Sequence, residues 1–344
     1  MLELLKTLCA LPGVSGDEGA ARDYIRREAE KYADEVTRDV MGNLLVTKRG
    51  ARRSAKKILL CAHMDEVGVI ATHLTEAGFV KFACVGGIDR RVLLGKRVFF
   101  GEKRVPGVVG SRPIHLIPRD EREKLPKLEE LYIDVGAPSR KDAEKLVSLG
   151  DTGAFDGGIL EFGDGFLRAK AIDDRLGCAV LLKLLASDLP VDCCFAFTVQ
   201  EEVGTRGAQT AAFRLEPDVA LIVEATTAAD LPGVADGKKV CFVGKGAVIP
   251  FMDGGAIYDR ALYDTLTALA TRHEIPWQTK TYLSGGTDAA AVQRSRGGVK
   301  TAALAAPVRN LHAPSCVGKI SDFEAVLRLA ELFLEDAGER YGTV

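Results

Sequence analysis

Three short, almost wholly apolar segments place the strongest constraint on the fold of this 344-residue chain. They are ILLCA at 58–62, CCFAFTV at 193–199 and VALIV at 219–223. Such continuous apolar runs are typical of strands that are buried on both faces, because helices cover both sides of a parallel sheet. RLGCAVLLKLLAS at 175–187 has a helical pattern and lies between the first two segments. This alternation of strand and helix predicts an α/β fold.

The spacing of apolar residues predicts further helices at both ends of the chain. Leucines at positions 2, 5 and 8 recur at helical spacing. Ser15 and Glu18 have the spacing of a capping box, so we expect Ser15 to open a second helix. Two more helices are expected over 262–270 and 322–338.

The composition and the pattern of apolar residues change between 70 and 163. Short β-rich pieces and many glycines replace the long apolar runs, and the charged linker RDEREKLPKLEE occupies 119–130. The glycines of DTGAFDGGILEFGDG at 151–165 are expected in tight turns, because no phosphate-binding glycine motif is present. The segment therefore predicts a small β-rich domain, with one short helix near 139–149. It divides the α/β domain into a first part, 1–69, and a second part, 164–344.

The charge balance excludes several classes of partner. Lys and Arg number 46 and Asp and Glu number 48, so the net charge is −2. A nucleic-acid or anionic-membrane binder would carry a clear basic excess, so no such partner is expected. No apolar stretch reaches the roughly 18 residues of a membrane helix, and Glu3 and Lys6 interrupt any signal peptide. We expect a cytoplasmic protein.

The eight cysteines show no CxxC spacing and lie mostly in apolar runs. They are expected to be small buried side chains in a reducing compartment. A thiolate zinc site would need closely spaced pairs, and the adjacent Cys193 and Cys194 point to opposite faces of a strand.

Polar residues gather where the apolar segments end. Because the carboxyl ends of parallel strands share one edge of a sheet, residues far apart in sequence can converge there. Two imidazoles with several carboxylates suit Zn²⁺, Co²⁺ or Mn²⁺, and a bridging carboxylate suits two ions about 3.5 to 4 Å apart. The candidates are His63, Asp65, Asp173, Asp174, Glu201, Glu202, Glu224 and His312.

Each of these signals is weak when taken alone, since an isolated histidine or pair of acids is usually solvated. Glu201 and Glu202 are more informative, because they directly follow a buried strand and could divide the roles of ligand and base. Gly285 to Asp288 fits either a turn or a part of the site. No GxSxG motif is present, which disfavours a serine nucleophile. Three histidines without a partner pattern are expected on loops or sheet surface: His73, His115 and His273.

The motifs AHMDEVG, KAIDDR, QEEVGTRGA, VEAT, SGGTDAAA and RNLHAP occur in this order along the chain. Their order and spacing resemble those of the M42 family of dinuclear metallo-aminopeptidases, the tetrahedral or TET aminopeptidases. The resemblance runs from PGVSGDE near the start to the last helix. It implies a zinc-exopeptidase-like α/β/α catalytic domain with an inserted β-rich dimerisation domain, and six dimers assembled into a hollow dodecamer.

The resemblance also implies roles for single residues. His63, Asp173 and Glu224 would bind one divalent ion, and Asp173, Glu202 and His312 the other, with Asp173 bridging. The ions would be zinc or cobalt, or alternatively manganese. Glu201 would be the general base, and Asp65 would orient the ring of His63.

One position departs from the family pattern, which has Asp where this chain has Glu224. The expected activity is release of N-terminal amino acids from short peptides. The longer Glu224 side chain keeps open a di-zinc deacylase or carboxypeptidase-like amide hydrolase. A sugar hydrolase is disfavoured, because it uses two carboxylates and needs no paired histidines. A catalytically silent scaffold subunit is a third alternative, although the complete set of acids and histidines speaks against it.

Overall fold

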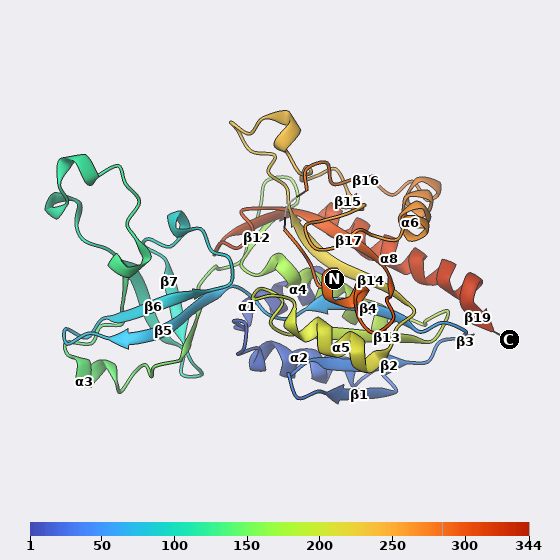
Figure 1. Ribbon diagram of the computed structural model, residues 1–344, viewed down its shortest axis with the longest axis horizontal. Helices are drawn as coiled ribbons and strands as arrows, with labels where there is room; N and C mark the ends of the chain where they lie inside the picture. Colours follow the sequence, from blue (N-terminus) through green and yellow to red (C-terminus); the bar gives the residue numbers. More distant parts are fainter. Residues whose placement is uncertain (284, 344) are drawn as a thin grey trace.

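The predicted apolar strands form the centre of a large mixed sheet (Figure 1). The structure is a computed structural model that describes residues 1–283 and 285–343. Within these residues the sheet has eleven strands, in the order β1-β2-β13-β4-β14-β17-β18-β12-β11; β15 pairs with β17, and β16 pairs with β15. The bounds are β1 Glu35–Arg38, β2 Leu44–Lys48, β4 Ile58–His63, β11 Leu160–Phe162, β12 Phe166–Ala169, β13 Cys193–Thr198, β14 Val219–Thr227, β15 Ala247–Val248, β16 Trp277–Gln278, β17 Lys300–Arg309 and β18 Cys316–Lys319.

The four central strands β13, β4, β14 and β17 are parallel, so their carboxyl ends lie at one edge. Alternate residues of each strand point to opposite faces, which produces two hydrophobic cores. Leu60 and Phe195 belong to the larger core, and Leu59 and Ala196 to the smaller one. This double burial confirms the predicted α/β/α arrangement.

Helices cover both faces of the sheet. The larger core contains buried side chains of α1, α2, α4, α6 and α8, and the smaller core contains those of α5 and α7. The described α-helices are α1 Leu2–Ala10, α2 Gly19–Ala29, α3 Arg140–Ala143, α4 Ile172–Leu185, α5 Arg206–Leu215, α6 Arg260–Arg272, α7 Ala289–Gln293 and α8 Ile320–Tyr341. None of the helices within 1–283 and 285–343 combines the length and the apolar character needed to span a bilayer.

A small closed barrel projects from one side of the sheet domain (Figure 1, cyan to green). Its strands follow one another around the barrel as β10-β5-β6-β9-β8-β7, and α3 is the short helix expected near 139–149. The bounds are β5 Gly68–Leu74, β6 Val80–Val85, β7 Arg97–Phe100, β8 Val105–Gly110, β9 Tyr132–Asp134 and β10 Thr152–Phe155. A separate two-stranded sheet pairs β3 Arg53–Ser54 with β19 Gly342–Thr343.

Strand β11 lies within the range 70–163 but pairs with β12 of the large sheet. The barrel strands themselves run from Gly68 to Phe155. We propose that 1–69 and 164–344 form one domain and 70–163 the other. The chain returns from the barrel to the large sheet between β10 and β11.

The predicted capping box is wrong. Helix α2 begins at Gly19 with Glu18 at the N-cap, and no side chain caps it. The hydroxyl of Ser15 instead donates to Asp65, 2.6 Å away, and Glu18 accepts from the main-chain N–H of Gly16. A long-range partner for Ser15 therefore replaces the local one that the spacing favoured.

Replacing Phe195 by Ala is expected to lower the free energy of unfolding by about 3–5 kcal/mol, because this fully buried ring fills the core beside the central strands. Chemical denaturation measures the change. Val40→Ala is the matched control, since Val40 is fully exposed and its loss should change stability by less than about 0.5 kcal/mol. Equal effects of the two substitutions would contradict the assignment of the core.

Candidate metal centre

The carboxyl edge of the parallel strands brings together the side chains predicted from sequence. His63 is the last residue of β4, Glu201 and Glu202 follow β13, and His312 follows β17. Asp173 lies in the first turn of α4. Glu224 differs from expectation, because β14 continues to Thr227 and places it inside the strand. Its side chain still reaches the edge, 3.7 Å from the Nε2 atom of His63.

Two overlapping groups of side chains could each hold a metal ion. In the first, His63, Asp173 and Glu224 each offer one ligand atom, and these atoms lie within 4.8 Å of one another. The second group meets the same limit with Asp173, Glu202 and His312. We call these sets the His63 group and the His312 group.

Asp173 belongs to both groups and faces them with different oxygens. Its Oδ1 atom lies 3.2 Å from the Nε2 of His63, and its Oδ2 atom lies 3.4 Å from the Nε2 of His312. The same nitrogen of His312 lies 3.1 Å from Glu202. A single carboxylate is thus placed between two imidazoles, as a bridging ligand requires.

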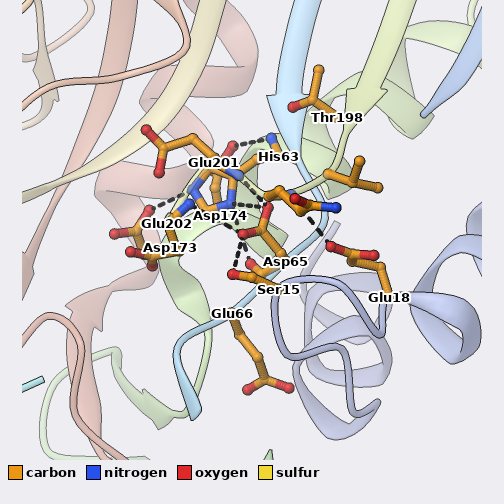
Figure 2. Close-up of polar contacts among 12 residues, drawn as sticks. Ser15, Glu18, His63, Asp65, Glu66, Asp173, Asp174, Thr198, Glu201 and Glu202 are labelled. Atoms are coloured by element: carbon orange, nitrogen blue, oxygen red, sulfur yellow. Dashed lines mark hydrogen bonds and ion pairs between the residues drawn. The ribbon is translucent and has the colours of Figure 1, made fainter. Parts of the chain in front are cut away.

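Asp65 organises the loop that carries the two glutamates (Figure 2). Its carboxylate accepts the main-chain N–H of Glu201 at 3.0 Å, that of Glu202 at 3.1 Å and the hydroxyl of Ser15. The ring Nδ1 of His63 lies 3.2 Å from the main-chain oxygen of Asp65 and 3.5 Å from its carboxylate. Asp65 therefore helps to hold both the ring of His63 and the loop 201–202 in place.

Asp65→Asn is expected to weaken metal binding about 10- to 100-fold, the usual effect of losing a group that supports the ligands. An amide has one accepting oxygen and cannot replace both carboxylate oxygens toward the loop 201–202. Competition with a chromophoric chelator measures the affinity, and Asp236→Asn on the surface is the control. An affinity equal to that of the parent would show that Asp65 has no such role.

The centre is rich in buried carboxylates that repel one another. Burial and the charge of Asp174 raise the pKa of Glu224 well above its usual range. Burial and the charge of Asp173 raise the pKa of Glu202 to about 7. Burial also raises the pKa of Glu201 to about 9, and the charge of Asp288 adds to the shift.

The histidines respond in the opposite way. Burial lowers the pKa of His312, but hydrogen bonding to Asp173 and the charge of Glu202 outweigh it and raise the pKa to about 9. In addition, the Oε1 atom of Glu224 is buried and has no hydrogen-bond partner among the described residues. An excess of buried acids and an unpaired carboxylate oxygen are features that divalent cations would relieve, so the residues present fit a metal site.

Two features of the site were not predicted from the sequence, the contacts of Gly87 and of Asp174, and the place of the segment 285–288 was left open. The ring Nδ1 of His312 bonds the main-chain oxygen of Gly87, which comes from the barrel. Asp288 is buried, accepts from Thr198 and lies close enough to Glu201 to raise its pKa, so the segment 285–288 does reach the site. Asp174, predicted without a role, accepts the main-chain N–H of His63 at 3.3 Å.

A buried ion network lies beside the centre. Lys170 donates to both carboxylate oxygens of Glu66 and to the main-chain oxygen of Leu11. Arg175 donates to the oxygen of Leu8 at the end of α1. This network ties α1 to the two loops that carry Asp65 and Asp173.

The sequence predicted no role at the site for the three remaining histidines. They are exposed and lie outside both groups, as expected: His73, His115 and His273.

Comparison with known proteins identifies the family. A family model described as M42 glutamyl aminopeptidase matches residues 42–329. The chain is 33% identical to the lysyl aminopeptidase of Pyrococcus furiosus over 344 residues, covering 97% of this chain and 96% of that protein.

Two solved structures extend the likeness to the whole fold. A TET aminopeptidase from a marine-sediment Thaumarchaeota archaeon superposes with a TM-score of 0.93 at 33% identity, covering 98% of both chains. The TET1 peptidase of Pyrococcus horikoshii gives a TM-score of 0.84 at 35% identity, covering 96% of this chain and 98% of that one. The chain therefore belongs to the M42 family of aminopeptidases and is a metal-dependent peptide hydrolase.

Proposed function

We propose that this protein is a dinuclear aminopeptidase that releases N-terminal amino acids from short peptides. The observation that carries the proposal is the placement of Asp173 between the His63 group and the His312 group. The ligand set of imidazoles and carboxylates, without thiolates, suits zinc, cobalt or manganese. Zinc and cobalt are the first candidates.

The chemistry follows from the residues at this edge of the sheet. Divalent ions, when bound, would supply polarisation of the scissile carbonyl and activation of water near neutral pH. His63, Asp173 and Glu224 would hold one ion, and Asp173, Glu202 and His312 the other. Glu201 lies at the same edge and belongs to neither group. The charge of the bound ions would favour its ionised form, in which it would take a proton from the attacking water. The same carboxyl then returns the proton to the leaving amine.

Metal removal and amine blocking test the proposal together. Dialysis against a chelator is expected to abolish release of amino acids from aminoacyl amides, and Zn²⁺ or Co²⁺ should restore it. Acetylation of the substrate's α-amine should stop cleavage by the restored enzyme. Undiminished turnover after removal of all metal, verified by elemental analysis, would refute the metal-dependent mechanism.

Glu224 supports a second candidate, an amide hydrolase for acylated or carboxyl-terminal substrates. Its side chain is one methylene longer than the Asp of the family pattern, and it contributes to the His63 group from inside β14. Faster cleavage of an N-acylated peptide than of the free peptide would decide for this candidate. The same pair of substrates thus separates the two functions.

We also propose that the protein assembles from identical chains and works in the cytoplasm. The Pyrococcus horikoshii relative can form a tetrahedron or a large octahedral shell. All eight cysteines are free, which agrees with a reducing compartment. Dimers built through the inserted barrel and assembled into a dodecamer are expected, and light scattering of the purified protein measures the mass. A monomer at micromolar concentration would contradict this assembly.

A further inference from the structure

We infer that the turn at Gly86 and Gly87 of the inserted barrel is a positioning element for the His312 group, so that the barrel sets the metal affinity of this group alone. The inference rests on the proposed dinuclear site. It assigns the barrel a part in the catalytic centre, in addition to its expected part in assembly.

The two imidazoles of the centre are oriented from different domains. His63 has its Nδ1 atom 3.2 Å from the main-chain oxygen of Asp65, two residues along its own chain segment. His312 has its Nδ1 atom 2.8 Å from the main-chain oxygen of Gly87, which is 225 residues away. A bond from one ring nitrogen to a carbonyl leaves the other nitrogen free for a metal ion and holds the ring in place.

The turn also contacts the second glutamate. Gly86 follows β6 and has a φ of +82°, a conformation that favours glycine. A Cβ atom at this position would lie 2.7 Å from Val67 and 3.4 Å from the Cβ of Glu202. The backbone of the turn therefore lies directly against Glu202 as well as His312, the two ligands that belong only to the His312 group.

Both crossings between barrel and sheet domain lie beside this group. Val67, just before β5, and Phe155, at the end of β10, line a small cavity together with Asp173, Glu202 and His312. The return segment passes close to the loop after His312, since a Cβ atom on Gly157 would lie 2.4 Å from the oxygen of Pro314. The barrel therefore joins the sheet domain beside the His312 group.

The two histidines also differ in how deeply they are buried. The side chain of His63 is 1% exposed and is enclosed by the sheet domain, whereas that of His312 is 32% exposed. His312 therefore depends more on its single bond to Gly87 for a fixed orientation. Loss of this bond should loosen one ion and leave the other in place.

Gly86→Ala is the test variant, because an added Cβ atom would lie 2.7 Å from a methyl carbon of the buried Val67, so that the turn or this side chain must shift. The φ of +82° also disfavours alanine at this position. Titration of Zn²⁺ into the metal-free full-length protein should show two bound ions for the parent. The variant should bind one ion about 10- to 100-fold more weakly, the usual effect of losing a group that orients a ligand. Its other ion should be bound as in the parent.

A matched control separates displacement of the turn from the mere addition of a methyl group. Gly95 also lies in the barrel with a positive φ, +72°, but has no neighbour within 4 Å of an added Cβ atom. Gly95→Ala should therefore bind two ions with parental affinity.

If Gly86→Ala does not fold, the double variant Val67→Ala/Gly86→Ala replaces it in the titration. The second substitution removes the close contact with Val67, while the alanine at position 86 still has to adopt a positive φ. The double variant should bind one ion more weakly than the parent and the other ion as the parent does. Parental binding of both ions by Gly86→Ala, or equal weakening of both, would overturn the inference. A parent that binds no second ion would instead refute the dinuclear site itself, so the two failures can be told apart.

Discussion

Glu201→Gln is expected to lower kcat/KM by about 10²- to 10⁴-fold, the range lost when a general base is removed. The amide keeps the size of the side chain but cannot accept a proton from water. Glu201 belongs to neither ligand group, so the metal content should stay at the parental value. Steady-state kinetics on an aminoacyl amide, with elemental analysis of the same sample, measures both quantities.

A matched control for this variant is Glu102→Gln, at an exposed barrel position. It makes the same chemical change away from the sheet edge and should leave kcat/KM unaltered. Retention of full activity by Glu201→Gln would remove it as the base. A parallel loss of metal would assign it to the ligands instead.

Asp173→Asn is expected to have the largest effect, because it changes both groups at once. Each oxygen of Asp173 faces a different histidine, and an amide presents an oxygen to only one of them. We expect loss of both ions and a fall in kcat/KM of at least about 10³-fold, equivalent to about 4 kcal/mol. Elemental analysis and kinetics again measure the outcome.

Glu202→Gln provides the comparison, since Glu202 belongs to the His312 group alone. It should release one ion and retain the other. Asp164→Asn, at an exposed carboxylate on the surface, should retain both. If Asp173→Asn lost one ion only, the two groups would not share this carboxylate and the bridging arrangement would be wrong.

The sequence was sufficient to predict the layers of the fold and the edge that carries the site. Residues 58–62, 193–199 and 219–223 are almost wholly apolar, which is typical of strands in the interior of a sheet that helices cover on both faces. Once these strands are parallel, His63, Glu201 and Glu224 must approach the same edge. The type of chemistry then follows from the types of side chain.

Contacts between distant segments could not be predicted in this way. Ser15 has the local spacing of a helix cap, and only the folded chain shows that Asp65 is its partner. The main-chain oxygen of Gly87 carries no sequence signal at all, because every residue has one. Asp288 had a signal in the motif SGGTDAAA, but its spacing suited a turn equally well. These residues support the ligands, and their roles depend on packing rather than on pattern.

Anomalous diffraction from crystals grown with Zn²⁺ tests the central claim most directly. Data collected on both sides of the zinc absorption edge locate the ions without reference to activity. The account predicts two peaks at the carboxyl edge of the sheet, one beside His63 and Glu224 and one beside Glu202 and His312, with Asp173 between them. Zinc bound elsewhere, or a single peak that does not touch Asp173, would contradict it.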